Sequence, residues 1–276
     1  MKNLILGLIL LLCTGCGQLD VIVRWADITA ASRADRYFDL TSEQKSELKE
    51  NIQNDIAKMR KEMFPEVAKT FRSLEPEIKK EQINKDLVSK NFIEIQSYFK
   101  KGTNYFKDTA LKTVGKLKKS QFEHFAKKVR EDITETQENN ETPEKSLKAS
   151  YKRYRRSLEF WIGGISVKQQ DEIENFLKAN PYPWQLQNKS REHSLKLFLE
   201  ASHNPGALQK FVADYFVDYE TSRLPEFNEA LNKHKAAFQT FLTEQFWKGL
   251  STSQKNVLRD NLISRADDLD KIAQRP

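Results

Sequence analysis

Few residues in this 276-residue chain have the types and spacing that catalysis or metal binding requires. The four histidines lie singly along the sequence (His124, His193, His203 and His234). None belongs to a His-Glu-x-x-His motif, which would place two imidazoles on one zinc ion. The chain also has no Gly-x-Ser-x-Gly nucleophile elbow and no glycine-rich phosphate loop. Carboxylates are plentiful, but Asp and Glu at helical spacing are by default surface residues. We therefore expect no catalytic residue, no metal site and no cofactor.

Cys16 is the residue whose surroundings point to a specific reaction. Lys2 precedes an apolar run from Leu4 to Leu12, which is followed by the small-residue cleavage site Cys13-Thr14-Gly15-Cys16. This order resembles a bacterial lipoprotein signal, in which cleavage before the Cys is accompanied by lipid attachment to its thiol. We predict a signal peptide over residues 1–15 and lipidation of Cys16, with fatty acyl chains such as palmitate. A secretory signal without lipid is the alternative, and the apolar run is too short to span a membrane.

Charge and cysteine content indicate where the mature chain works. Removal of Cys13 with the signal leaves Cys16 as the only cysteine, so an intrachain disulfide is excluded and helix packing must provide the stability. The formal net charge of +7 falls by one when Lys2 is removed. In the envelope, this modest excess fits anionic lipid or cell wall better than nucleic acid. Gly17 follows Cys16, where an Asp commonly retains lipoproteins in the inner membrane. The resemblance to lipoprotein sorting signals therefore implies an outer-membrane protein that faces the periplasm.

A short motif that recurs along the chain indicates how the protein is built. An aliphatic residue, then Ser or Thr, then Gln three positions later occurs at Leu40–Gln44, Ile165–Gln169 and Leu250–Gln254. A copy at Leu117–Gln121 lacks the hydroxyl residue. This pattern is typical of a helix start, where the hydroxyl and the Gln cap each other's backbone amides. We predict N-caps at Thr41, Ser166 and Ser251, each paired in a capping box with the Gln three residues later, which is Gln44, Gln169 or Gln254.

Apolar spacing between these motifs predicts an all-α fold. Residues 19–37 have one amphipathic stripe, and a second stripe runs from Leu48 to Met63 before Phe64-Pro65, where we expect a helix break. We predict a multi-helix bundle of about ten helices in a single periplasmic domain, residues 16–276. Residues 131–144 are acidic and lack apolar periodicity beyond Ile133, so we expect an exposed loop there between two packed halves, 19–130 and 145–276.

The lipoprotein signal together with the runs Asp35–Gln44 and Arg155–Gln170 resembles an uncharacterised family of Gram-negative outer-membrane lipoproteins that has only a domain-of-unknown-function label. This resemblance implies a fold and a location, but no reaction. The Leu-Thr-x-x-Gln motif at Leu40–Gln44 is also similar to that of the CpxP and Spy periplasmic proteins. The same five residues suit any helix N-terminus, and shared helix-start physics is the favoured explanation of this second similarity.

We expect a non-catalytic, lipid-anchored protein that binds an envelope component or maintains the envelope. Its partners would be the membrane, through the lipid on Cys16, and an envelope protein, a lipid or the cell wall. A groove between the halves would lie near Trp161, Trp184 and Trp247, although each of these is more often core. Two alternatives stay open, an envelope hydrolase of unrecognised type and a Spy-like chaperone or stress sensor.

Overall fold

The computed structural model describes residues 18–275 and has the all-α architecture that the sequence predicts. Among the described residues there are eleven α-helices and no strands. The helices are α2 (Gln18–Phe38), α3 (Ser42–Ile78), α4 (Lys85–Asn104), α5 (Lys107–Val114), α6 (Lys119–Glu138), α7 (Pro143–Ile162), α8 (Val167–Ala179), α9 (Trp184–Ala201), α10 (Pro205–Val217), α11 (Pro225–Phe241) and α12 (Thr252–Ala273). A π-helical turn (Leu242–Phe246) and a 3₁₀ turn (Trp247–Gly249) connect α11 to α12.

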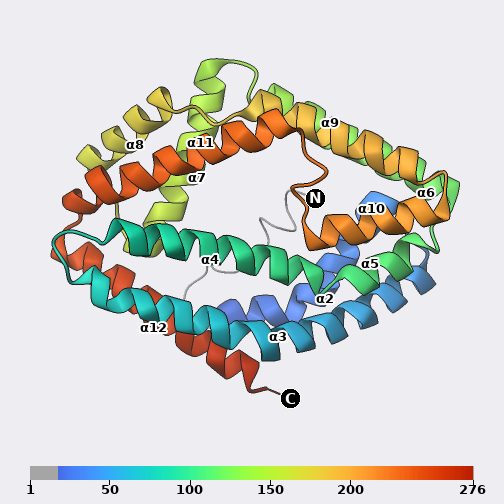
Figure 1. Cartoon of the computed structure of the whole chain (residues 1–276), viewed down its shortest axis with the longest axis horizontal. Helices are drawn as coiled ribbons and strands as arrows, with labels where there is room; N and C mark the ends of the chain where they lie inside the picture. The colour runs from blue at the N-terminus through green and yellow to red at the C-terminus, as the bar shows by residue number, and fades with distance from the viewer. Residues whose placement is uncertain (1–17, 276) are drawn as a thin grey trace.

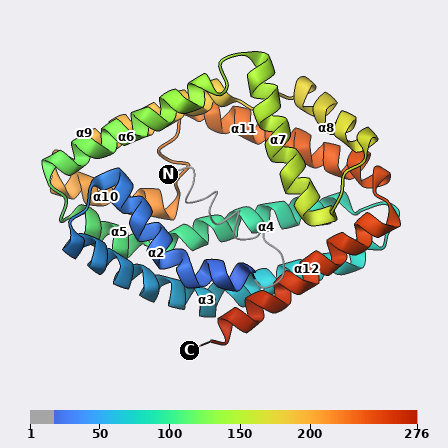
Figure 2. The ribbon, with the colours of Figure 1, turned by 180° about the vertical axis from the view of Figure 1, so that it is seen from behind.

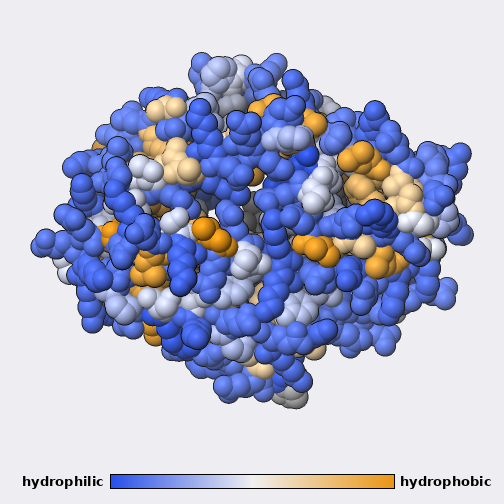
Figure 3. Space-filling view, viewed as in Figure 1, coloured by the Kyte–Doolittle hydropathy of each residue, from blue (hydrophilic) through white to orange (hydrophobic). Residues whose placement is uncertain are grey.

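The helices form a flattened frame rather than a column of parallel helices. In Figure 1 one side of the frame contains α3, α4 and α12, the other contains α6, α9 and α11, and α5 and α10 complete one end. Figure 2 shows α2 running over the opposite face, beside α3. Side chains fill most of the space between the ribbons, and Figure 3 shows a small hollow near the middle of the face seen there.

Three hydrophobic clusters, spread around the frame, hold it together. The first joins α2, α3 and α12, the second joins α5, α6, α9 and α10, and the third joins α7, α8 and α11. Since α12 packs along α3, and α6 packs along α9, each expected half buries part of its apolar surface against the other. Residues 19–130 and 145–276 are therefore packed against each other in one frame.

The expected loop over residues 131–144 is wrong for most of its length. Helix α6 continues to Glu138, and only residues 139–142 connect it to α7. The stripe of α6 extends to Ile133, which is buried in the second cluster. Beside it, Asp132 accepts a hydrogen bond from Tyr37 and lies 3.8 Å from the guanidinium of Arg191. These contacts with α2 and α9 stabilise the helical conformation of the acidic segment, and its local sequence does not reveal them.

The expected helix break at Phe64-Pro65 is also wrong. Helix α3 runs through both Pro65 and Pro76, and Met63 and Val67 on either side of Pro65 belong to the same buried stripe. Pro65 is exposed, so water can reach the backbone carbonyl that loses its helical donor. Packing of a continuous apolar stripe along α12 therefore outweighs the local cost of the proline.

Candidate functional site

The helix-start motif forms reciprocal capping boxes at Thr41, Ser166 and Ser251. In each, the hydroxyl accepts from the backbone N–H of the Gln, and the Gln side-chain oxygen accepts from the backbone N–H of the capping residue. The N···O distances lie between 2.9 and 3.3 Å, for the pairs Thr41 and Gln44, Ser166 and Gln169, and Ser251 and Gln254. Each box therefore satisfies two backbone donors at the helix start, one with the hydroxyl and one with the side-chain oxygen of the Gln.

The same glutamines also join helix starts that are far apart in the sequence. Gln44 Nε2 donates to Gln121 Oε1 at 3.3 Å, and Gln121 Nε2 donates back to Gln44 Oε1 at 2.9 Å. Gln44 also donates to the carbonyl of Lys116, and Gln121 to that of Asp39. We call this arrangement the first glutamine junction, and it fastens the start of α3 to the start of α6.

A second glutamine junction repeats this pattern at the starts of α8 and α12. Gln169 Nε2 donates to Gln254 Oε1 at 3.1 Å, and Gln254 Nε2 donates to Gln169 Oε1 at 2.9 Å. The spare donors bind the carbonyls of Gly249 and Gly164. One Gln of each junction is buried, Gln121 in the first and Gln169 in the second. The two junctions are therefore built alike from two motif copies each.

The junctions explain why the motif has Gln at a position where Glu would also cap a helix. A carboxylate could accept from the backbone N–H, but only an amide can also donate to the opposite Gln and to a carbonyl. The copy at 117–121 shows this role most clearly, because Lys118 has no acceptor and Gln121 still accepts from the Lys118 N–H at 2.9 Å. Sequence reasoning found the caps but missed the pairing. The similar separations of 77 residues (Gln44 to Gln121) and 85 residues (Gln169 to Gln254) are the signal that could have indicated it.

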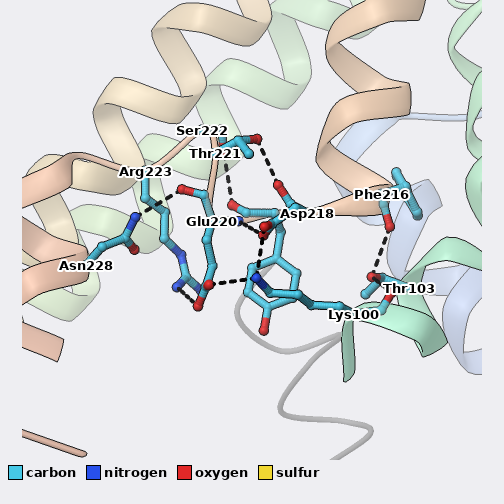
Figure 4. Close-up of polar contacts among 10 residues, drawn as sticks. Lys100, Thr103, Phe216, Asp218, Glu220, Thr221, Ser222, Arg223 and Asn228 are labelled. Carbon is cyan, nitrogen blue, oxygen red and sulfur yellow. Dashed lines mark hydrogen bonds and ion pairs between the residues drawn. The ribbon is translucent and has the colours of Figure 1, made fainter. Parts of the chain in front are cut away.

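A polar network crosses the middle of the frame, where the 218–224 loop between α10 and α11 meets α4 (Figure 4). Lys100 Nζ lies 2.8 Å from a carboxylate oxygen of Asp218 and 2.9 Å from one of Glu220. Arg223 approaches the other oxygen of Glu220 at 3.4 Å. A further bond runs from the Thr103 hydroxyl to the carbonyl of Phe216. The network ties the loop to α4.

The ion pairs fix the charge states of this network. Hydrogen bonding to Asp218, and then to Glu220, raises the pKa of Lys100. Burial alone would raise the pKa of Asp218, but the bond from Lys100 and the backbone N–H of Glu220 lower it overall. Burial, with the nearby charges of Arg223 and Lys100, lowers the pKa of Lys235 on α11. Carboxylates paired in this way suit structural linkage better than proton transfer.

His234 is the buried histidine, and it lies in an aromatic cluster. Its Nε2 is hydrogen-bonded to the hydroxyl of Tyr154, and Tyr154, Phe176 and Tyr182 pack around the ring. Burial lowers the pKa of His234 and raises that of Tyr154. Burial therefore favours the neutral form of both groups.

The other histidines do not converge with His234. His193 and His203 line a shallow cleft of about 480 Å³ between α6 and α9, next to Arg130 and Lys196. Within residues 18–275, no group of three or more His, Cys, Asp or Glu side chains could hold a metal ion. The cleft is open, and its lining mixes basic residues with Glu192 and Glu200. Arg130 lies 3.2 Å from Glu192.

The tryptophans do not form the groove that the sequence suggested. Trp184 and Trp247 are both 6% exposed and belong to the interior, and Trp184 donates to the hydroxyl of Ser150 at 3.1 Å. Trp161 packs edge-on against Phe71. The exposed tryptophan is Trp25, on the outer face of α2 together with Val21 and Ile28.

Comparison with known protein families finds a match. A family model described as a family of unknown function, DUF6279, matches residues 36–227, which is more than half of the chain. The chain belongs to this family. The DUF6279 match includes the first glutamine junction and Gln169, and it ends before Gln254. No curated protein and no solved structure matches the chain. Cys16, the predicted lipidation site, lies outside the residues that the structure describes.

Proposed function

We propose that this protein is a non-catalytic, lipid-anchored binding protein of the bacterial envelope. In this proposal the chain is cleaved before Cys16, acylated there, and held at the periplasmic side of the outer membrane. Its helical frame binds an envelope protein, a lipid or the cell wall and so contributes to envelope maintenance. Within residues 18–275 no helix is long and apolar enough to cross a bilayer.

The observation that supports this proposal is the position of α2 relative to Cys16. Helix α2 begins at Gln18, and its inner side is already part of the frame, because Val23, Asp27 and Ala31 are buried. Asp27 accepts a hydrogen bond from Gln53 of α3 at 2.7 Å. A lipid on Cys16 would therefore be connected to the frame without a flexible linker, in contrast to domains that hang from long Gly-rich or Ser-rich tethers. The frame would work close to the bilayer surface.

The anchoring part is tested on the full-length chain expressed in a Gram-negative host. Mass spectrometry of the mature N-terminus should find a diacylglyceryl and N-acyl Cys16, and membrane fractionation should find the protein in the outer membrane. A Cys16→Ser variant should lose the lipid. A wild-type chain with a free amine at another first residue would overturn the proposal.

The binding part is tested by photocrosslinking in intact cells. Photoreactive residues are placed at Ile93, Val167 and Val217, which are exposed apolar positions on α4, α8 and α10. We expect one of these sites to capture a single envelope component, which then binds the purified protein directly. Turnover of a cell-wall or lipid substrate that one carboxylate substitution abolishes would instead show an enzyme. Suppression of aggregation of unrelated client proteins would instead favour a chaperone.

A further inference from the structure

Helix α2 has an apolar outer face that no other described part of the chain covers. Val21, Trp25 and Ile28 are 52%, 57% and 37% exposed. Their spacing of four and three residues places them in one stripe, on the side of α2 away from the buried Val23 and Ala31. Scattered apolar residues are common on surfaces, whereas these three lie next to one another, and contiguous apolar patches are typical of surfaces that bind a partner or a membrane.

The position of this stripe points to a bilayer as its partner. Cys16 precedes Val21 by five residues, and five residues span at most about 17 Å even when fully extended. A lipid on Cys16 would therefore hold the stripe within reach of the membrane surface. Trp is enriched where a membrane meets water, because its large apolar ring has one polar N–H.

The charges of α2 agree with this partner. Arg24 is exposed, and the side chain of Arg36 is 67% exposed. The guanidinium of Arg36 also lies 3.9 Å from a carboxylate oxygen of Asp132. Two acidic residues of the helix are paired within the protein, since Asp27 is buried against Gln53 and Asp35 lies 2.6 Å from Lys45. The exposed side thus presents apolar residues with flanking cations, which is the pattern of helices that lie in the interface of an anionic membrane.

We propose that the outer face of α2 docks on the phospholipid surface, with Val21, Trp25 and Ile28 inserted among the upper acyl chains and Arg24 and Arg36 at the phosphates. This inference rests on the proposed acylation of Cys16 and adds a second contact to it. An acyl anchor alone leaves the frame free to rotate. A docked α2 fixes which face of the frame lies against the membrane and which faces the periplasm.

The test uses the absence of any other free thiol in an acylated, mature chain. Single cysteines are introduced by Trp25→Cys and Ile28→Cys, with Ile93→Cys and Val217→Cys as controls, because these two residues are equally apolar and 65% and 52% exposed on other helices. The full-length lipoprotein is labelled with an environment-sensitive fluorophore and reconstituted in vesicles of phosphatidylethanolamine and phosphatidylglycerol. Thermal melting checks that each variant is folded.

We expect blue-shifted emission and several-fold stronger quenching by brominated phospholipids at positions 25 and 28 than at positions 93 and 217. Equal, water-like signals at all four positions in an acylated protein would overturn the docking inference alone. A shift that appears only at high protein-to-lipid ratio would assign the face to a second copy of the chain and also overturn it. Lack of acylation at Cys16, read from the mass of the same sample, would overturn both proposals.

Discussion

The side-chain amides of Gln44 and Gln121 hold each other in both directions, with Nε2 of each residue donating to Oε1 of the other. Each oxygen also accepts from the backbone N–H of its own helix start, and each nitrogen also donates to a carbonyl next to the opposite helix. Two amides therefore satisfy two helix N-termini and two connecting loops at once. Gln169 and Gln254 do the same at the other junction.

We predict that Gln254→Glu destabilises the protein by about 1–3 kcal/mol. The carboxylate can still cap its own helix, but it cannot donate to the carbonyl of Gly164 or to Oε1 of Gln169, and it places an oxygen 2.7 to 2.9 Å from both. Considered alone, the helix dipole would favour Glu at this position, so the predicted sign is opposite to that of an isolated helix. Urea unfolding gives the free energy.

The matched control for this change is Ser253→Glu, one residue earlier in the first turn of α12 and exposed. There the added charge can interact with the helix dipole without touching the junction, so we expect no loss of stability and a gain of a few tenths of a kcal/mol. If both variants lost the same stability, added charge rather than the amide pair would be responsible, and the role of the junction would be wrong.

Thr41→Ala should cost on the order of 1 kcal/mol, because it removes the hydroxyl that accepts from Gln44 N–H at 3.2 Å. Ser42→Ala is the control, since the first helical position needs no side-chain acceptor. Chemical denaturation compares the two variants with the wild type. Equal effects of the two changes would mean that loss of a hydroxyl, rather than loss of the cap, determines the result.

The sequence predicts the helix starts and the buried stripes well, because both depend on residues within one or two turns. Thr41 with Gln44, and the stripe from Leu48 to Met63, are local patterns of this kind. The same local reasoning predicted a break at Phe64-Pro65 and a loop over residues 131–144. Both errors come from contacts with distant helices, α12 in the first case and α9 in the second.

The local sequence does not show the glutamine junctions for the same physical reason, and only the similar separations of the motif copies hint at the pairing. A capping Gln has an amide N–H₂ group that is free to bind water, and nothing nearby in the sequence shows that its partner is another capping Gln. The exposed face of α2 is a similar case. Trp25 fits both a core stripe and a surface stripe until the packing of Val23 and Ala31 shows which side of the helix is inside.

Lys100→Met should loosen the 218–224 loop while the rest of the frame stays intact. The variant removes the cation that lies within 3 Å of both Asp218 and Glu220 and leaves the length of the side chain nearly unchanged. Faster amide hydrogen exchange in the loop, but not in α3, is the expected result. Lys101→Met, at the neighbouring position of α4, is the control, because it breaks an exposed ion pair with Glu66 of α3.

The same variant should also change the response to acid. The pKa of Asp218 is lowered in the folded protein, so its contribution to stability is present above the ordinary Asp pKa and is lost as the pH falls through the lowered value. The difference in melting temperature between the wild type and Lys100→Met should therefore shrink as the pH is reduced below about 4. A difference that stays constant down to strongly acidic pH would show that Lys100 acts by packing rather than by its charge.

His234 should make the protein less stable as the pH falls below about 6.5, the ordinary histidine pKa. Burial, with the nearby charge of Arg153, lowers the pKa of His234. At a pH between the folded and the unfolded pKa, the imidazole is therefore protonated in the unfolded chain and neutral in the folded chain. The stability that the neutral His234 contributes is therefore fully present above the unfolded pKa, and it declines as the pH falls from the unfolded to the folded pKa.

His234→Gln removes this titration while an amide oxygen can still accept from the Tyr154 hydroxyl. We expect the variant to be less stable at pH 7.5, because it loses the aromatic packing. Its urea midpoint should change less between pH 7.5 and 5.5 than that of the wild type. His203→Gln, at an exposed position, should follow the wild type, and an unchanged slope in His234→Gln would show that the acid sensitivity comes from other groups.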